Sequence, residues 1–222
     1  MQRIPEPELM TDFDQVLGWD NANRKLSIYN LKYWVSTLRF TKGTILEIGC
    51  GAGLHIIELA KEYTDAKFVG IDGSPTMIKL AKEKIINEGL ESRVSLICSK
   101  IEDYIPTQSF DAIISYGTLH HVEDQKQFWS IINKINANAS PVLIIDILRP
   151  KNEELLEHYM RSADNENKFY KQDLYNSFRA AYTTTEIFDT LNDLKIPFQH
   201  YEGVHADRGN VIVILLNTNL AL

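Results

Sequence analysis

Short hydrophobic runs alternate with longer stretches of helical periodicity from about residue 43 onward. The runs are rich in β-branched residues and almost continuously apolar, which is typical of strands that are buried on both faces of a parallel sheet. Strands are therefore predicted over residues 43–48, 67–71, 94–97, 112–115 and 141–145. Helices are predicted between them over residues 54–63, 75–88 and 124–137. This order of elements predicts an α/β fold with a doubly wound, mostly parallel sheet.

The last third of the chain has a different pattern. Residues 152–195 are helical in character with a loop near residues 161–167, and two further strands are predicted over 198–203 and 210–216. Residues 204–209 connect these strands, and a parallel pair would need a crossover of about a dozen residues or more. The sheet is therefore expected to end in an antiparallel hairpin.

Composition and charge narrow the class of protein. Of the 222 residues, 44% are hydrophobic and 24% are charged, which is ordinary for a globular chain and excludes a disordered or fibrous one. The 23 Lys and Arg against 30 Asp and Glu give a net charge of −7. Such a surface repels phosphate backbones, so we expect no nucleic-acid partner and prefer a small-molecule substrate.

Targeting and metal signals are weak. The longest strongly apolar run, Val211–Leu216, is six residues long, far short of a membrane helix, and residues 1–6 do not resemble a secretory signal. Cys50 and Cys98 have no spacing typical of a metal site or a disulfide framework. We expect a reduced, cytoplasmic protein with no membrane partner and no metal.

Three glycines at alternate positions, Gly49, Gly51 and Gly53, follow the first predicted strand and precede a helix. Glycine is required where the backbone turns tightly or approaches a ligand closely, so the loop predicts a bound cofactor. The dinucleotide fingerprint G-x-G-x-x-G would place glycine at position 54, where the chain has Leu54. This departure argues against a pyrophosphate bound at the helix N-terminus.

An acidic residue, Asp72, ends the second predicted strand 19 residues after Gly53. Since the carboxyl ends of neighbouring strands face one crevice, Asp72 is expected beside the glycine loop, where its carboxylate can accept both hydroxyls of a ribose. The alternative is that Asp72 only begins the turn before Ser74. For Glu47 the alternative to a binding role is a buried acid that backbone donors satisfy.

The run Glu47-x-Gly49-x-Gly51-x-Gly53 followed by Asp72 resembles the class I S-adenosylmethionine-dependent methyltransferases. Residues 110–115 are similar to the fourth strand of that family, and Leu119-His120-His121-Val122 to the segment after it. The resemblance covers about residues 40–147. It implies a Rossmann-like seven-stranded sheet whose final hairpin is antiparallel, in agreement with the loop length.

The resemblance implies S-adenosyl-L-methionine as the cofactor. The residues expected around it are Glu47, Gly49, Cys50, Gly51, Gly53, Asp72, Gly73, Ser74, Met77, Ile101, Glu102, Ser115 and Tyr29. Family members often carry Asp where this chain has Lys100, so we expect backbone groups to recognise the adenine amino group.

By analogy with the family, residues 1–40, with a helix over 22–38, form a lid, and residues 41–222 form the methyltransferase domain. A helical insertion at about 152–180 stands where relatives place acceptor-recognition elements. Aromatic rings of the lid helix can attract a sulfonium or a cationic acceptor, although an ordinary amphipathic helix would also bury such rings. The expected acceptor-binding residues are Tyr33, Trp34, His121, Arg149 and Arg179.

Methyl transfer from a sulfonium needs an in-line approach, so most of the catalysis comes from positioning. A hydroxyl or ammonium acceptor also needs a general base. The candidates at strand carboxyl ends are His120, which we prefer, Tyr116 and Asp146. The alternatives are that the two histidines only pack, and that Asp146 and Arg149 form a surface ion pair.

The sequence therefore predicts an S-adenosylmethionine-dependent methyltransferase that acts on a small molecule. One alternative is an RNA or protein methyltransferase, and another is a non-catalytic protein of this fold that binds the nucleoside. The acceptor and the oligomeric state stay open at this point.

Overall fold

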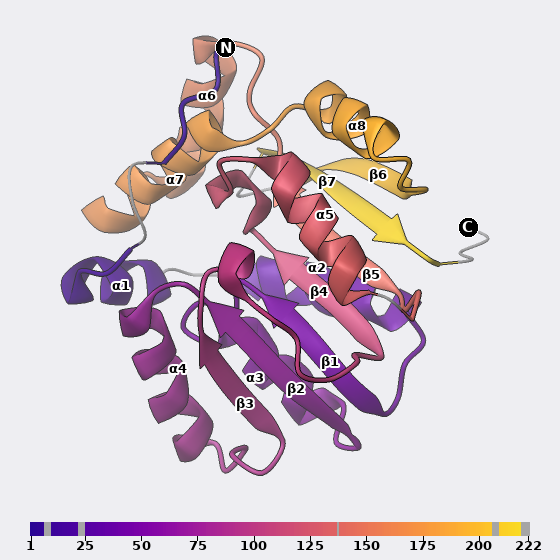
Figure 1. Cartoon of the computed structure of the whole chain (residues 1–222). Coiled ribbons are helices and arrows are strands. Elements are labelled where there is room, and N and C mark those ends of the chain that lie inside the picture. Colours follow the sequence, from indigo (N-terminus) through magenta and orange to yellow (C-terminus); the bar gives the residue numbers. More distant parts are fainter. Residues whose placement is uncertain (7–9, 22–24, 137, 206–208, 219–222) are drawn as a thin grey trace.

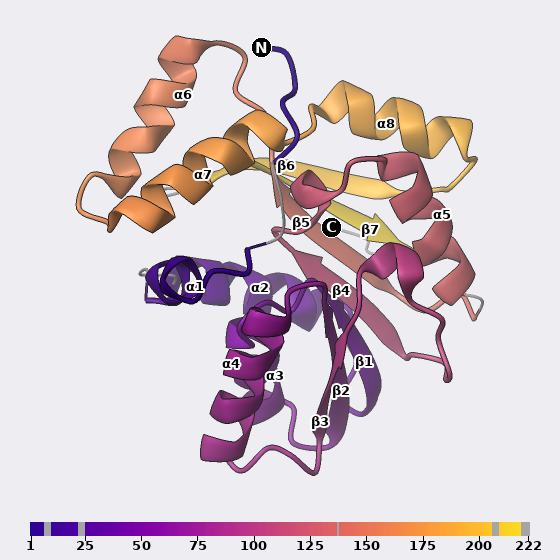
Figure 2. The same ribbon diagram turned by 60° about the vertical axis from the view of Figure 1, so that its left-hand side comes forward.

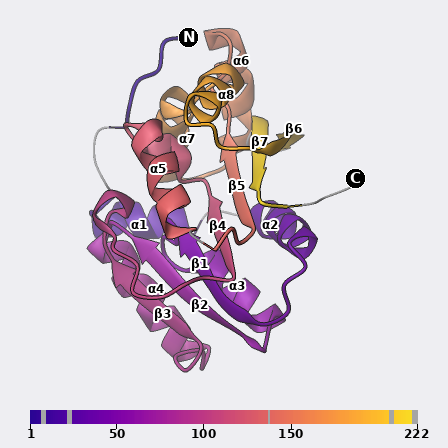
Figure 3. The same cartoon turned by 45° about the vertical axis from the view of Figure 1, so that its right-hand side comes forward.

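Seven strands form one sheet in the computed structural model of the chain, in the order β3-β2-β1-β4-β5-β7-β6 (Figure 1). The strands are β1 Gly43–Ile48, β2 Ala66–Asp72, β3 Val94–Cys98, β4 Ala112–Tyr116, β5 Val142–Ile147, β6 Gln199–His205 and β7 Gly209–Leu216. The first five are parallel, and β7 runs antiparallel to both β5 and β6. The predicted doubly wound sheet and its C-terminal hairpin are confirmed, and Figure 3 shows β3 and β6 at opposite edges.

The structure describes residues 1–6, 10–21, 25–136, 138–205 and 209–218, with only the backbone for residues 25–27 and 205. Helices cover both faces of the sheet around its central strands β1, β4 and β5. One face carries α2 Lys25–Thr37, α3 Leu54–Glu62 and α4 Pro75–Asn87, and the other carries α5 Gln125–Ile135 and α8 Thr184–Asp193 (Figure 2). Adjacent residues of β1 serve the two cores, because Ile45 faces α2 and α3 whereas Leu46 faces α5.

Above the carboxyl ends of the strands lie α1 Phe13–Asp20, α6 Glu153–Met160 and α7 Lys168–Ala180 (Figure 2). The pair α6 and α7 is the insertion expected at 152–180, and its apolar residues form a core of their own around Leu156, Leu174 and Phe178. Three short 3-10 helices complete the fold: η1 Ile101–Asp103, η2 Leu119–His121 and η3 Arg161–Ala163. Within the described residues, no helix has the length and apolar character needed to cross a bilayer.

The N-terminal region differs from the expectation. The helix predicted over 22–38 is α2, whose predicted first residues 22–24 lie outside the described part of the chain. Leu31 and Val35 of α2 are buried on the sheet face with α3, so this helix belongs to the core and is not a lid. The place over the strand ends is taken by α1, which begins where Asp12 accepts a hydrogen bond from the Gln15 N–H.

Candidate active site

A cavity of about 390 Å³ lies at the carboxyl ends of β1, β2 and β4, which is within the usual size range of small-molecule sites. Its floor is the loop after β1, the end of β2 and η1, and its cover comes from α1 and from Pro5, Glu6 and Met10. The predicted site residues that line it are Gly49, Cys50, Gly51, Asp72, Gly73, Ser74, Met77, Ile101, Glu102, Tyr116 and His121.

Each glycine of the loop has a positive φ, but Gly49 and Gly53 are required for different structural reasons. A Cβ on Gly49 would collide with the Thr118 side chain, so this glycine lets the loop lie against the segment after β4. Gly53 is the N-cap of α3, where a Cβ would come within 3.1 Å of Ala81 of α4, and it does not line the cavity. The sequence pattern alone does not separate a glycine that faces a ligand from one that packs two helices together.

The N–H groups of the loop are already used inside the protein. Gly49 and Cys50 donate to the Ile71 carbonyl at 2.8 and 3.0 Å, and Gly51 donates to Asp72 at 2.9 Å. A phosphate site would need such donors to point at the ligand. Their use within the protein therefore agrees with the missing dinucleotide fingerprint.

The Asp72 carboxylate is fixed at the edge of the cavity by two backbone donors. Oδ2 accepts from Gly51 N–H at 2.9 Å and Oδ1 accepts from Ser74 N–H at 2.8 Å. Burial raises the pKa of Asp72 and outweighs the opposing effect of these two hydrogen bonds. Each oxygen can accept further hydrogen bonds, so one carboxylate makes the turn before Ser74 and can also bind a ligand.

Beneath the loop, three predicted residues are buried. Glu47 has its Oε1 3.7 Å from His55 Nδ1, whereas its Oε2 has no hydrogen-bond partner among the described residues. Burial, together with the nearby Asp72 charge, raises the pKa of Glu47 well above its usual value. Burial likewise raises the pKa of the Cys50 thiol, which marks it as an inert filler. The Ser115 hydroxyl donates to the Ile48 carbonyl at 3.0 Å and does not line the cavity.

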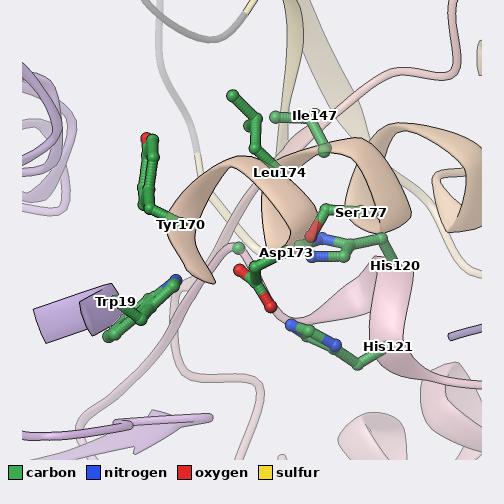
Figure 4. Close-up of a pocket in the computed structure, with 9 residues that line it drawn as sticks. Trp19, His120, His121, Ile147, Tyr170, Asp173, Leu174 and Ser177 are labelled. Atoms are coloured by element: carbon green, nitrogen blue, oxygen red, sulfur yellow. The ribbon is translucent and has the colours of Figure 1, made fainter. Parts of the chain in front are cut away.

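A small cavity of about 30 Å³ adjoins the large one and is bordered by both histidines of η2 (Figure 4). His120 is buried, and its Nδ1 lies 2.6 Å from Asp146 Oδ1. Asp146 also accepts from His120 N–H at 3.3 Å and from Ile147 N–H at 2.7 Å. Because a carboxylate accepts hydrogen bonds, this contact places a ring proton of His120 on Nδ1.

His121 pairs with an acid that the sequence did not single out. Its Nδ1 lies 2.6 Å from Glu6 Oε2, and Glu6 Oε1 accepts from the Ser177 hydroxyl at 2.8 Å. Burial disfavours the charged ring of His121, but the hydrogen bond and charge of Glu6 outweigh this and raise its pKa to about 9. Burial likewise opposes the charge of Glu6, but its contacts, His121 first among them, lower its pKa to about 2.

Ligand atoms of Glu6, His120 and His121 all lie within 4.8 Å of one another, which is close enough for a shared metal ion. However, two ligands of one zinc ion stand roughly 3 Å or more apart. The 2.6 Å between Glu6 and His121 is a hydrogen-bond length. The cluster as it stands is an ion pair.

Glu6 belongs to the N-terminal strap, residues 1–6, which Arg3 fastens to the loop after η2 and to α7. Arg3 donates to the carbonyls of Ala180 at 2.6 Å, Val122 at 2.7 Å and His120 at 3.2 Å. Its guanidinium also lies 4.0 Å from the centre of the Tyr182 ring. These partners are more than a hundred residues away along the chain, so no local pattern predicts them.

Several residues expected to bind the cofactor or the acceptor lie elsewhere. Tyr29 and Tyr33 are 69% and 56% exposed on α2, and Trp34 of that helix packs on a ring of β6. Arg149 bonds Glu186 of α8 at 2.6 Å, so neither the surface pair with Asp146 nor a place at the cavity is observed. Arg179 donates to the Tyr175 hydroxyl at 2.7 Å and also does not line the cavity.

Helices α1 and α7 supply cavity residues that the sequence did not identify. They are Gln15, Trp19, Asp173 and Asn176. The last two are three positions apart on α7, a spacing that puts them on one helical face. For Asp173 and Asn176, that spacing is the local feature of the sequence that indicates a shared face.

Comparisons with known proteins agree with this geometry. The model of a family described as "Methyltransferase domain" matches residues 40–195. Malonyl-[acyl-carrier protein] O-methyltransferase of Priestia megaterium is 45% identical over 74 residues, which are 33% of this chain and 26% of that protein. The chain spans 26% to 35% of the length of three curated relatives, this one included.

Two solved structures share the fold. The plantazolicin methyltransferase BpumL, crystallised with S-adenosylhomocysteine, has a TM-score of 0.71 at 16% identity, over 93% of this chain and 90% of its own. An S-adenosylmethionine-dependent methyltransferase of Aquifex aeolicus has a TM-score of 0.68 at 19% identity, over 92% of this chain and 97% of its own. With the family model covering most of the sequence, the chain belongs to the methyltransferase domain family.

Proposed function

We propose that this protein transfers a methyl group from S-adenosyl-L-methionine to a small-molecule acceptor. The observation that carries the proposal is the Asp72 carboxylate, held by two backbone N–H groups beside the glycine loop of a 390 Å³ cavity. Membership of the methyltransferase domain family supports it. The acceptor class follows from the cover of the cavity and from the net charge of −7, which disfavours a nucleic-acid substrate.

The residues around the cavity fit this cofactor. Asp72 would accept the ribose hydroxyls, while Met77 and Ile101 offer apolar contacts to the adenine. The loop, whose N–H groups are used internally, suits the ammonium of the amino-acid end better than a phosphate. Glu47 lies buried below that loop with one unpartnered oxygen. When bound, the cofactor supplies an electrophilic methyl group on a sulfonium.

His120 is the proposed general base. Asp146 acts through His120, because it holds the ring proton on Nδ1 and so directs the basic Nε2 away from itself. His121 does not suit this role at neutral pH, since Glu6 holds it in the charged form. The small cavity of about 30 Å³ has room for an acceptor atom or a water beside His120. Tyr116 lines the large cavity and would contact the ligands there.

Calorimetric titration with S-adenosylhomocysteine tests the cofactor assignment. We expect binding to the native protein, and Asp72→Ala is expected to weaken it by about 1–3 kcal/mol because a buried hydrogen-bonded carboxylate is lost. The matched control is Asp65→Ala, which removes an exposed aspartate. A folded protein that does not bind millimolar ligand would refute the proposal, and an unchanged affinity of Asp72→Ala would refute the ribose contact.

Methyl-labelled cofactor and a cell extract test the reaction. Label in the small-molecule fraction is the expected result. Label in RNA or protein, falling steeply with salt for RNA, would favour a macromolecular substrate instead. Tight cofactor binding with no transfer to any fraction would indicate a non-catalytic binding protein.

A further inference from the structure

The N-terminal strap brings one carboxylate to both histidines of the proposed site. Glu6 Oε2 lies 2.6 Å from His121 Nδ1, and Glu6 Oε1 lies 3.9 Å from His120 Nε2. The Glu6 side chain is 10% exposed, and the Ser177 hydroxyl of α7 donates to it at 2.8 Å. Glu6 also lines the large cavity, so this one residue of the strap contacts both the histidines and the space where ligands would bind.

We propose that Glu6 is a positioning residue, which pins His121 against His120 and so completes the proposed base only when the strap is seated. The inference rests on the proposed methyl transfer for its catalytic meaning. Its structural part, the coupling of the strap to the two rings, can be measured without any acceptor.

The geometry shows how pinning one ring orders the other. His120 is held at Nδ1 by Asp146, and the His121 ring packs beside it with centroids 4.1 Å apart (Figure 4). The His121 side chain is 40% exposed, and Glu6 of the strap lies 2.6 Å from its Nδ1. The charged groups that act on His121 include Glu6 of the strap, Asp173 of α7, Asp146 at the end of β5 and Asp72 at the end of β2. Its imidazolium is therefore surrounded by carboxylates from several segments, of which Glu6 is the one on the strap.

Seating of the strap depends on a different residue. Arg3 donates to the carbonyls of His120 and Val122, in and next to the helix that carries the histidine pair, and to Ala180 at the end of α7. Arg3 does not line the cavity. Two separate substitutions can therefore break the same coupling, one at the carboxylate and one at the anchor.

Ring-nitrogen NMR of the histidines tests the coupling. Each histidine is titrated from about pH 5 to about pH 10 in the native protein, in three variants of the strap and in one control variant. In Glu6→Gln, which keeps the shape and removes the charge, the His121 titration is expected to move down by more than about one pH unit. Arg3→Met is expected to move it in the same direction, and Glu6→Asp to keep most of the native value. Glu157→Gln, an exposed site on α6, is the charge control. An unchanged His121 titration in Glu6→Gln would overturn the proposal.

The rate of label transfer into the small-molecule fraction of a cell extract tests the catalytic meaning. At saturating cofactor, Glu6→Gln is expected to lose at least about tenfold in rate and to change the pH profile. Native-like rates in Glu6→Gln at every pH would refute the positioning role and leave the proposed function intact. A native protein that transfers no label would refute the function, while the NMR titration would still decide the coupling.

Discussion

Replacing Asp146 with asparagine tests the proposed base most directly, because the side chain keeps its shape and loses only its charge and one acceptor. Asp146 is 3% exposed, and its Oδ1 accepts from both His120 Nδ1 and Ile147 N–H, while Oδ2 faces His120 N–H. With the amide oxygen at the Oδ1 position, the amide NH2 opposes the His120 N–H. With the amide turned over, it opposes the Ile147 N–H and forces the proton of His120 onto Nε2.

Each orientation leaves one buried backbone donor unpaired, which costs about 1–3 kcal/mol. For a chain of this size, each kcal/mol lowers Tm by roughly 2–4 °C, so Asp146→Asn should stay folded at room temperature. The turned amide removes the lone pair from Nε2, and losing an oriented general base costs about 10²–10⁴ in rate. Asp146 does not line the large cavity, so the affinity for S-adenosylhomocysteine should be unchanged.

The assay is transfer of labelled methyl into the small-molecule fraction of an extract, beside a thermal melt and a cofactor titration. Asp189→Asn, an exposed aspartate of α8, is the matched control. A folded Asp146→Asn variant that keeps its rate within about threefold would refute the role of the His120–Asp146 pair as base. Loss of cofactor binding would show instead that Asp146 supports the cavity itself.

Three further predictions concern the strap, the exit of β5 and the glycine loop. The His121 pKa of about 9 lies above its ordinary value of 6.5. The stability that His121 gives to the seated strap is therefore complete below pH 6.5 and is lost as pH rises through 9. The Glu6 pKa of about 2 lies below its ordinary 4.5, so its contribution is complete above 4.5 and is lost as pH falls through 2. Amide hydrogen exchange of the strap, corrected for intrinsic rates, should therefore show the greatest protection between pH 4.5 and 6.5. Above pH 9 the free energy of opening of the strap should fall by about 1 kcal/mol, a small value because His121 is partly exposed to solvent. Constant protection to pH 10 would contradict the ion pair. Arg149→Met should lower the free energy of unfolding by about 1–3 kcal/mol, because its bond to Glu186 is lost, without changing cofactor affinity. Gly49→Ala should lower both stability and cofactor affinity, because its positive φ and the Thr118 contact exclude a Cβ, and a native-like melt would contradict this.

Local patterns were sufficient for the sheet and for most of the residues from β1, β2 and η1 that line the large cavity. The buried runs from Gly43 to Ile147 carry their strand signal in consecutive residues, and the short connection before β7 determines its direction. Asp72 was predictable because parallel strands end at the same edge of a sheet. In each case the informative residues are close in sequence or are related by a fixed topology.

The contacts of Arg149 and Glu6, and the packing of α1 and α2, depend on residues that are distant in the sequence. Arg149 binds Glu186, 37 residues away, although Asp146 is nearer in sequence. Glu6 meets His121 only because α7 and η2 form a seat for the strap. Helix α1 is only eight residues long, so its hydrophobic periodicity is too short to predict it. The hydrophobic pattern of α2 is the same whether the helix covers a cavity or a sheet. Such choices are settled by tertiary packing and leave little trace in any one segment.

The anchoring of the strap also fixes an order of events during synthesis. Arg3 is synthesised well before its acceptors, which are carbonyls 117 to 177 residues further along the chain. Closing a contact of that sequence separation is slow compared with forming local structure. The parallel strands β1 to β5 can pair before α7, which carries the Ala180 and Ser177 partners of the strap, is available. Assembly of the histidine pair with its second carboxylate is therefore a late folding step, which waits for α7 to emerge and dock.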